Sequence, residues 1–243
     1  MRMLNFAKRN FKELIRDPLS LVFEIILPIF LLFIFQQFNL PDDAYKIDNF
    51  TPSIILFGFS FITLFTATLV AKDRTSSFLI RLGTSPMKSS DYILGYILSL
   101  LPIILIQEIL FFFVGILLGL SFSINIIYAI LVSLVIAIFF ITLGILIGSI
   151  SSEKGTGGIG SVIVQLVCFT SGMYFPKEMV GKVFAFICEI LPFESSLNII
   201  QGVLNNNLSK ITSCNIITFA IYAIIVLVIT IIVFKNKMVS DNK

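Results

Sequence analysis

A long stretch with a single charged side chain limits what this chain can fold into more than any other feature. Residues 92–152 are sixty-one in number and contain only one Asp, Glu, Lys or Arg, namely Glu108. A helix needs about 20 apolar residues to cross a bilayer, so this stretch is too long for one span and long enough for two. The polar break at 121–125 therefore predicts an antiparallel hairpin of two membrane helices.

Other apolar runs extend the same interpretation to the whole chain. The 243 residues are 57% hydrophobic, more than a soluble domain needs to form its core. We therefore expect an all-α polytopic membrane protein with one transmembrane domain over residues 1–243. The six predicted spans are residues 19–38, 52–71, 92–120, 124–150, 156–175 and 211–234.

Residues 3–16 have the pattern of an amphipathic helix. Apolar residues recur at helical spacing and basic residues fall largely on the other side, which predicts a helix lying along the membrane interface. Asp17 and Pro18 suit the cap and first position of the following helix. A secretory signal peptide is excluded because the next apolar run is too long and no small-residue cleavage site follows.

The polar segment from Lys72 to Asp91 separates the second and third predicted spans. Ser76 or Ser77 suits a helix cap, the apolar residues that follow would share one face, and glycine and proline would then end the helix. This predicts a short cytosolic helix that docks into a groove of a partner, whereas the alternative is a loop whose charges only set topology. The predicted docking residues are Thr75, Ser76, Phe78, Leu79, Arg81, Leu82, Gly83 and Pro86.

Residues 176–210 form the longest stretch without a predicted span. Within it, Val183–Leu191 is apolar but has only nine residues, too few to cross a membrane. We expect a short re-entrant or interfacial pair of helices here, between spans five and six.

The distribution of basic residues predicts the orientation. The N-terminus, the 72–91 segment, Lys154 and the C-terminal tail together hold 13 of the 17 Lys and Arg residues, and the opposite side holds four. Basic residues concentrate on the cytosolic side of membrane proteins. Both termini are therefore expected in the cytosol of what is expected to be a bacterial cell, with residues 176–210 outside its membrane.

The sequence offers no constellation for catalysis. It has no His, no carboxylate cluster with metal-ligand spacing and no nucleotide-binding motif, because Lys154 precedes the glycines at 155–160 instead of following them. We predict no catalytic or metal site, and interpret those glycines as helix-packing positions. Cys188 and Cys214 fall on the same predicted side, and whether they pair is left open, with two small buried thiols favoured.

Glu24 and Glu108 are the two carboxylates inside predicted spans. A charged group near the middle of a bilayer costs about 2.5–3.5 kcal/mol, so it is usually paired, protonated or placed on a water-filled path. Two interpretations stay open for these residues, a role in proton-coupled transport and a hydrogen bond that fixes helix packing.

Three sequence segments resemble the membrane permease of type-2 ATP-binding-cassette (ABC) exporters. They are Lys8-Arg9-Asn10-Phe11-Lys12-Glu13-Leu14 with Arg16-Asp17-Pro18, Arg81-Leu82-Gly83-Thr84-Ser85-Pro86-Met87 followed by Tyr92 and Gly95-Tyr96, and Ser171-Gly172-Met173-Tyr174-Phe175-Pro176 leading to Leu191-Pro192. The resemblance implies that residues 3–16 are a connecting helix, 75–87 a coupling helix that contacts an ATPase, and 177–195 outer re-entrant helices. Residues 72–77 depart from the more acidic stretch of many relatives, which leaves the identity of the ATPase open.

The resemblance also implies partners and an activity. The chain would pair with a second permease copy, identical or related, and with two cytosolic ATPase subunits that bind ATP and Mg. It would bind no cofactor or nucleic acid itself, would not be an enzyme, and would export an amphipathic drug, lipid or peptide. The alternatives are an ion-coupled carrier that uses Glu24 and Glu108, and a non-transporting membrane scaffold or immunity protein.

Overall fold

The computed structural model describes residues 2–38, 42–76, 89–175 and 179–240, and every regular element in these ranges is a helix. The longer elements are α1 (Arg2–Ile15), α4 (Ile47–Thr75), α6 (Ser89–Leu117), α7 (Asn125–Ile150), α8 (Glu153–Thr170), α10 (Pro192–Leu204) and α11 (Ser213–Ser240). The shorter elements are α2 (Pro18–Leu21), the π-helical turn η1 (Val22–Ile26), α3 (Leu27–Gln37), α9 (Lys182–Ile190), and the 3-10 turns η2 (Asp43–Tyr45) and η4 (Leu208–Lys210). The predicted all-α class is confirmed for these residues.

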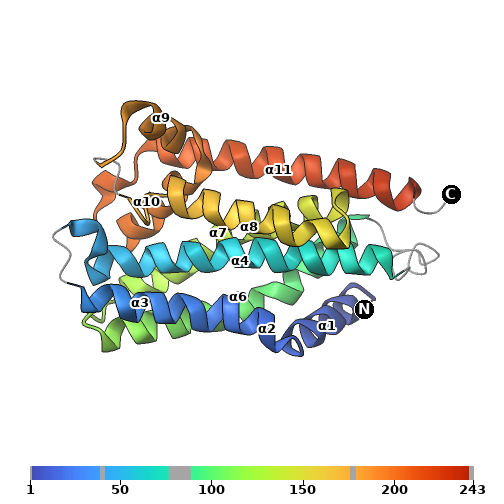
Figure 1. Cartoon of the computed structure of the whole chain (residues 1–243), viewed down its shortest axis with the longest axis horizontal. Coiled ribbons are helices and arrows are strands. Elements are labelled where there is room, and N and C mark those ends of the chain that lie inside the picture. The colour runs from blue at the N-terminus through green and yellow to red at the C-terminus, as the bar shows by residue number, and fades with distance from the viewer. Residues whose placement is uncertain (1, 39–41, 77–88, 176–178, 241–243) are drawn as a thin grey trace.

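The helices form one elongated bundle in which α4 is the central element (Figure 1). Most of α4 is buried: 83% of the residues in its most apolar 18-residue stretch lie inside the bundle. Helix α1 lies at one end of the bundle, which we call the α1 end, and α9 lies at the opposite end, the α9 end (Figure 1). Both chain termini lie at the α1 end (Figure 1).

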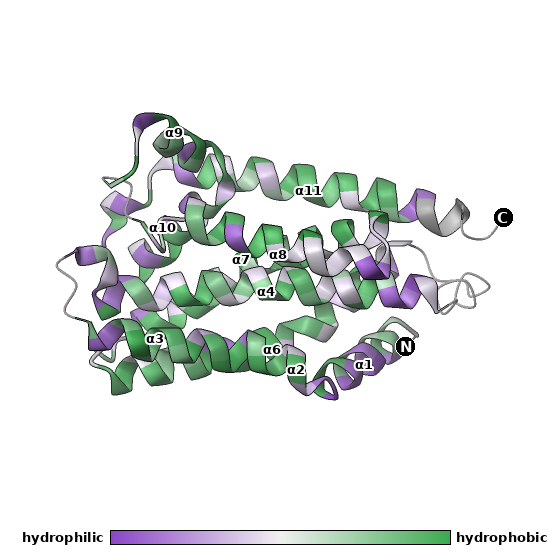
Figure 2. Ribbon diagram, viewed as in Figure 1, coloured by the Kyte–Doolittle hydropathy of each residue, from purple (hydrophilic) through white to green (hydrophobic). Residues whose placement is uncertain are grey.

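Apolar residues cover the length of the bundle, and polar residues gather towards its ends (Figure 2). Five helical segments of the described chain are long and apolar enough to cross a membrane: Pro18–Gln37, Ile47–Thr75, Ser89–Leu117, Asn125–Ile150 and Ser213–Asn236. Helix α8 runs alongside α4 but is not among them (Figure 1). Predicted spans one to four and six are thus confirmed as apolar helices. The remaining span, predicted at residues 156–175, corresponds to α8, a helix that ends earlier, at Thr170.

A bent pair of helices occupies the region predicted to be re-entrant. Helices α9 and α10 meet at an angle of 75°. Leu191, between them, has an extended backbone with ψ 150°, as expected for a residue that precedes proline. Helix α9 exposes Val183 and Phe186, whereas most of α10 is buried and continues to Leu204. The bend is therefore local and caused by Pro192, and re-entry into the membrane stays a prediction.

Helices α4 and α7 approach each other backbone to backbone. A Cβ atom added to Gly144 would lie 2.6 Å from the Thr63 carbonyl oxygen, and one added to Gly148 would lie 2.5 Å from that of Ala67. The Thr63 hydroxyl donates a hydrogen bond of 2.9 Å to the Phe140 carbonyl across the same contact. Small residues four positions apart allow this close approach.

The glycines singled out from the sequence contribute less to packing. Added Cβ atoms at Gly157 and Gly158 would meet no described atom within 4 Å, whereas one at Gly160 would press on the Leu64 side chain. Only Gly160 of these three thus marks a close helix contact within the described structure.

The three cysteines form no disulfide in the structure. Cys168 and Cys188 are buried, and Cys214 is exposed. The interpretation of Cys188 and Cys214 as two small buried thiols is therefore right for Cys188 and wrong for Cys214, which is exposed.

Candidate functional site

The last turn of α4 joins four other helices at the α1 end. We call Lys72, Asp73, Arg74 and Thr75, together with the side chains that they bond, the α4-end network. The predicted span ended at residue 71, before these four residues, but α4 continues through them to Thr75. Basic side chains in a last helical turn interact favourably with the negative end of the helix dipole, which helps to explain the longer helix.

Asp73 is the buried centre of the network. Its side chain is completely inaccessible to solvent, and it accepts a 2.6 Å hydrogen bond from the Arg9 guanidinium of α1. Its second oxygen accepts a 2.8 Å bond from the Tyr96 hydroxyl of α6. A buried carboxylate needs such partners, since an unpaired charge in an apolar interior is strongly disfavoured. Asp73 therefore ties α1, α4 and α6 together.

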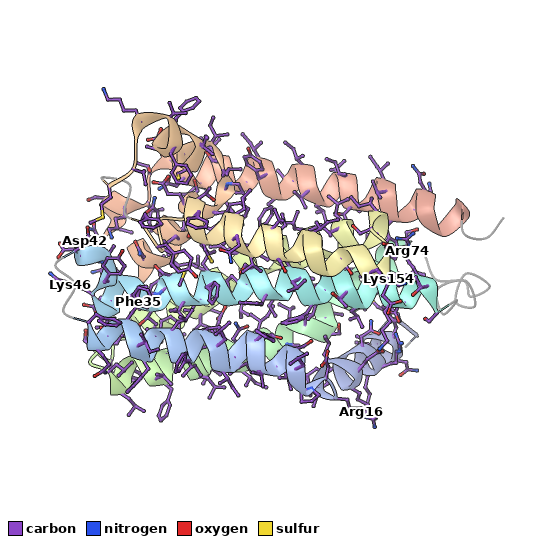
Figure 3. The ribbon with its side chains drawn as sticks, viewed as in Figure 1. Arg16, Phe35, Asp42, Lys46, Arg74 and Lys154 are labelled. Carbon is purple, nitrogen blue, oxygen red and sulfur yellow. The ribbon has the colours of Figure 1, made fainter. Side chains whose placement is uncertain are left out.

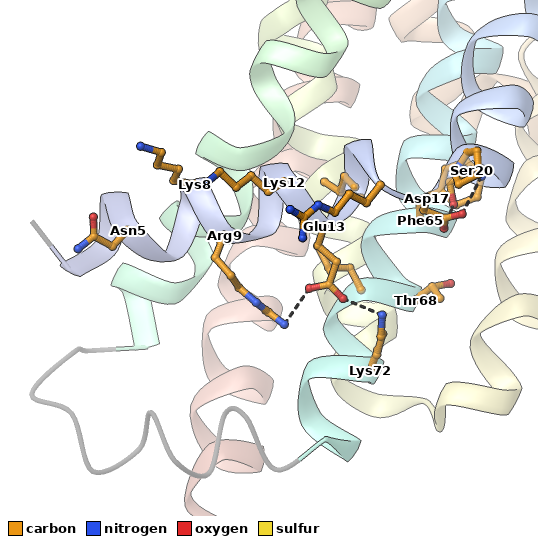
Figure 4. Close-up of a pocket in the computed structure, with 14 residues that line it drawn as sticks. Asn5, Lys8, Arg9, Lys12, Glu13, Asp17, Ser20, Phe65, Thr68 and Lys72 are labelled. Carbon is orange, nitrogen blue, oxygen red and sulfur yellow. Dashed lines mark hydrogen bonds and ion pairs between the residues drawn. The ribbon is translucent and has the colours of Figure 1, made fainter.

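A second ion pair holds α1 against α4 nearer to the surface. Glu13 accepts a 2.7 Å bond from the Lys72 ammonium and pairs with Arg9 of its own helix at 2.8 Å. These three side chains converge between α1 and α4 (Figure 4). Because Lys72 is more than half exposed, this pair is expected to add little stability, and its role is to fix the position of α1.

Arg74 and Thr75 of α4 form hydrogen bonds to the connection between α7 and α8. Arg74 donates to the carbonyl oxygens of Gly148 and Ser151 at 3.0 and 3.3 Å, groups that the end of α7 leaves without helical partners. The Thr75 hydroxyl donates to Glu153, in the first turn of α8, at 2.8 Å. The last turn of α4 is thus fixed to both helices.

An aromatic contact fixes α1 to α6 beside the network. Phe6 makes edge-to-face contacts with Tyr92 and Tyr96, at ring-centroid distances of 5.5 and 5.0 Å. Gly95 lies between them, and a Cβ atom there would lie 2.5 Å from the Phe6 ring. The Tyr92, Gly95 and Tyr96 motif noted in the sequence therefore forms the surface on which α1 packs.

Only part of the predicted docking site can be compared with the structure. Thr75 and Ser76 lie at the end of α4, where Ser76 is the C-cap residue and its hydroxyl donates to the Asp73 carbonyl. The other predicted docking residues, Phe78, Leu79, Arg81, Leu82, Gly83 and Pro86, lie outside the described residues. The structure therefore shows what holds the start of the segment, and the coupling helix stays a prediction.

Sequence reasoning missed the pairing of Arg9 with Asp73. Helical spacing put Arg9 on the polar side of α1 with Lys8 and Lys12, and spacing alone does not distinguish an exposed cation from one directed at a partner helix. A usable signal was present, because Asp73 stands between two basic residues at the end of an apolar span. An acidic residue in that position is a good candidate for an ion pair with the amphipathic helix.

The intramembrane carboxylate Glu24 lies in the π-helical turn η1 and is buried. Pro28, four residues later, has no N–H to donate to the Glu24 carbonyl. That carbonyl instead accepts a 3.2 Å bond from the Gln107 side chain of α6. The contact links the broken first span to α6 through the backbone of Glu24, and its carboxyl oxygen Oε1 has no hydrogen-bond partner among the described residues.

Glu108 is completely buried beside Gln107. Its carboxyl group lies close to Ser133, whose hydroxyl donates a 3.0 Å hydrogen bond to the Ile130 carbonyl. Both interpretations of Glu24 and Glu108 stay predictions.

The Gln107 bond predicts a measurable loss when it is removed. Gln107→Leu should lower the free energy of unfolding by about 1 kcal/mol, because it removes the 3.2 Å hydrogen bond to the Glu24 carbonyl. In a Pro28→Ala background, residue 28 regains an N–H, so the same change should cost less. Thermal unfolding of the four variants in detergent measures this difference, and equal losses in both backgrounds would contradict the assignment.

One family model matches this chain over most of its length. The model is that of the ABC-2 type transporter, and it matches residues 3–205, which include α1, the α4-end network and the bent α9–α10 pair. No curated protein matches the chain.

Proposed function

The chain belongs to the ABC-2 type transporter family, and we propose that it is the membrane permease subunit of an exporter driven by a separate ATPase. In this proposal two ATPase subunits bind ATP and Mg on the cytosolic side, and a second permease copy completes the pathway. The cargo is an amphipathic molecule such as a drug, a lipid or a peptide. The chain itself transports and does not hydrolyse ATP.

The α4-end network is the observation that carries this proposal. It lies immediately before residues 77–88, the segment proposed to contact the ATPase. A force applied to that segment would act directly on α4, which precedes it, and on α6, which follows it. Through the last turn of α4 it would also reach α1, α7 and α8. Packed helices respond to such forces by moving as rigid bodies between discrete arrangements. The network therefore supports a mechanism in which ATP-driven movement opens a path on the other side.

The charge distribution supports an orientation with the α1 end in the cytosol. Arg16, Arg74 and Lys154 all lie at this end, whereas Asp42 and Lys46 lie at the α9 end (Figure 3). An excess of basic residues at one end of a membrane protein is typical of its cytosolic face, which supports this orientation. The proposed location is the cell membrane, and the proposed host is a bacterium.

Two buried carboxylates, Glu24 and Glu108, are the features that a rival ion-coupled carrier would use. The helices that carry them are joined by a hydrogen bond from the Gln107 side-chain amide to the backbone carbonyl of Glu24. This bond is a packing contact and not a path for protons. The permease proposal therefore accounts for more of the described structure.

The proposal predicts an ATPase in complexes purified from the native cell. The tagged chain, extracted in mild detergent, should co-elute with an ATP-hydrolysing subunit. Replacing Phe78 and Leu82 with Asp should abolish this association, because charged groups would occupy the predicted apolar docking face. Assay of the eluate for ATP hydrolysis measures the result.

Two outcomes would count against this proposal. A well-folded wild-type protein that elutes without ATPase activity would contradict the permease function. Retained ATPase activity in the Phe78→Asp/Leu82→Asp variant would leave the function intact and refute the docking site. Detergent solubility and a single size-exclusion peak serve as the folding control for the variant.

A further inference from the structure

We propose that the cavity between α1 and α4 binds the phosphate group of an acidic phospholipid in the leaflet that the α1 end faces. The cavity has a volume of about 710 Å³ and is lined by α1, the junction of α1 with α2, and one face of α4 (Figure 4). This volume suits a small ligand, since such sites usually measure about 300–1,000 Å³.

The charge of the lining favours an anion. Five of the lining residues are basic and two are acidic, so the cavity carries a formal charge of +3. The whole chain also has a net charge of +3. The charged lining residues are Lys8, Arg9, Lys12, Arg16 and Lys72, with Glu13 and Asp17.

Internal partners already occupy the two acidic groups. Glu13 pairs with Arg9 and Lys72 in the α4-end network. Asp17 caps α2, accepting bonds from the Ser20 amide at 3.3 Å and the Ser20 hydroxyl at 2.5 Å.

Three basic residues are left to bind an external anion. Within the part of the chain that the structure describes, no carboxylate pairs with Lys8, Lys12 or Arg16. All three are exposed around the cavity. Arginine and lysine side chains form strong, charge-assisted hydrogen bonds to phosphate oxygens. An external phosphate would therefore compensate charges that the protein itself leaves unpaired.

The surroundings favour a lipid as the source of that phosphate. Leu4 and Ile15 of α1 and Leu19 of α2 are exposed apolar residues near the cations in the sequence, with exposures of 58%, 48% and 66%. Phe65 and Leu69 of α4 supply an apolar part of the lining. A basic helix with exposed apolar residues, placed where the chain enters its first span, is suited to the headgroup region of a membrane. A phospholipid would satisfy the cations with its phosphate and the apolar residues with its chains.

Binding of labelled phosphatidylglycerol to the purified full chain in neutral detergent tests the proposal. Phosphatidylglycerol should bind more tightly than phosphatidylcholine, which has no net charge. The Lys8→Gln/Lys12→Gln variant should bind phosphatidylglycerol about 25-fold more weakly, since each cation contributes about a factor of five at an acidic lipid surface. The Lys8→Arg/Lys12→Arg variant keeps both charges and should bind like the wild type.

A matched control uses two exposed lysines at the same end that do not line the cavity. Lys154→Gln/Lys235→Gln makes the same change in charge and should leave binding unchanged. An equal loss in this control, or equal binding of the two lipids by the wild type, would overturn the proposal. Displacement of the lipid by an equal concentration of inorganic phosphate would indicate a site for soluble anions and overturn it too. The assay contains no ATPase, so its outcome is independent of the proposed transport function.

Discussion

Replacing Arg9 with methionine is expected to lower the free energy of unfolding by about 3 kcal/mol or more, because it leaves Asp73 buried without its cationic partner. Asp73 retains the Tyr96 hydroxyl, which cannot neutralise its charge. The reverse change, Asp73→Asn, should cost less, since Arg9 is about one-third exposed and still pairs with Glu13. Thermal unfolding in detergent, or reversible unfolding in mixed micelles, measures both losses.

Lys72→Met is the control for this prediction. It removes a cation from the turn of α4 that carries Asp73, but the Lys72 side chain is 55% exposed. The expected loss in the free energy of unfolding is therefore about 0–1 kcal/mol. The double variant Arg9→Met/Asp73→Asn should be more stable than the sum of the single losses implies, because neither charge is left buried alone. Additive losses, or a loss in Lys72→Met as large as that in Arg9→Met, would show that Asp73 is not the centre of the network.

The largest packing effect is expected at the contact of α4 with α7. Gly148→Ala would place a methyl group 2.5 Å from the Ala67 carbonyl oxygen, a backbone atom that cannot move unless α4 moves with it. Overpacking of this kind costs about 1–3 kcal/mol, and a larger residue such as leucine should prevent folding into the same arrangement. The melting temperature in detergent measures the smaller change.

Helix α8 offers matched controls for this glycine effect. Gly157→Ala and Gly158→Ala introduce the same methyl group where no described atom lies within 4 Å. Alanine favours a helix over glycine by about 0.5–1 kcal/mol, so these variants should be slightly stabilised. Opposite signs at Gly148 and Gly157 would confirm the close approach of α4 and α7, and a neutral Gly148→Ala variant would contradict it.

The all-helical class and the apolar helices could be predicted from the sequence because membrane spans depend on local composition. The length of an apolar run determines whether it can cross a bilayer, and five of the six predicted spans correspond to apolar helices. The bend at Leu191 was also accessible, since Pro192 restricts the residue before it whatever the rest of the fold does.

Features that depend on distant partners could not be predicted in the same way. Pro28 cannot donate an N–H to the Glu24 carbonyl, but the side chain that bonds this carbonyl belongs to Gln107, which is 83 positions away in the sequence. The Arg9–Asp73 pair joins residues 64 positions apart. Helical periodicity describes one helix at a time, so it contains no information on which side chain of another helix will face a given residue.

The glycines illustrate the same limit. The sequence contains two sets of glycines in apolar segments, Gly144 with Gly148 and the cluster at residues 155–160. From the sequence, the cluster was predicted to be the site of close helix packing. The structure places α4 directly against Gly144 and Gly148, whereas it places no described atom within 4 Å of an added Cβ at Gly157 or Gly158. Glycine permits close packing, but the arrangement of the helices decides where the close packing occurs.

Site-specific photocross-linking in the native cell would test the central claim most directly. A photoreactive phenylalanine analogue would replace Phe78, which follows the α4-end network, or Phe122, which is 85% exposed between α6 and α7 at the other end of the bundle. Coupling of a cytosolic ATPase to the end of α4 predicts a cross-link to an ATP-binding subunit from position 78 and none from position 122. A cross-link to that subunit from position 122, or none from position 78 in a chain that still co-purifies with the ATPase, would contradict this account.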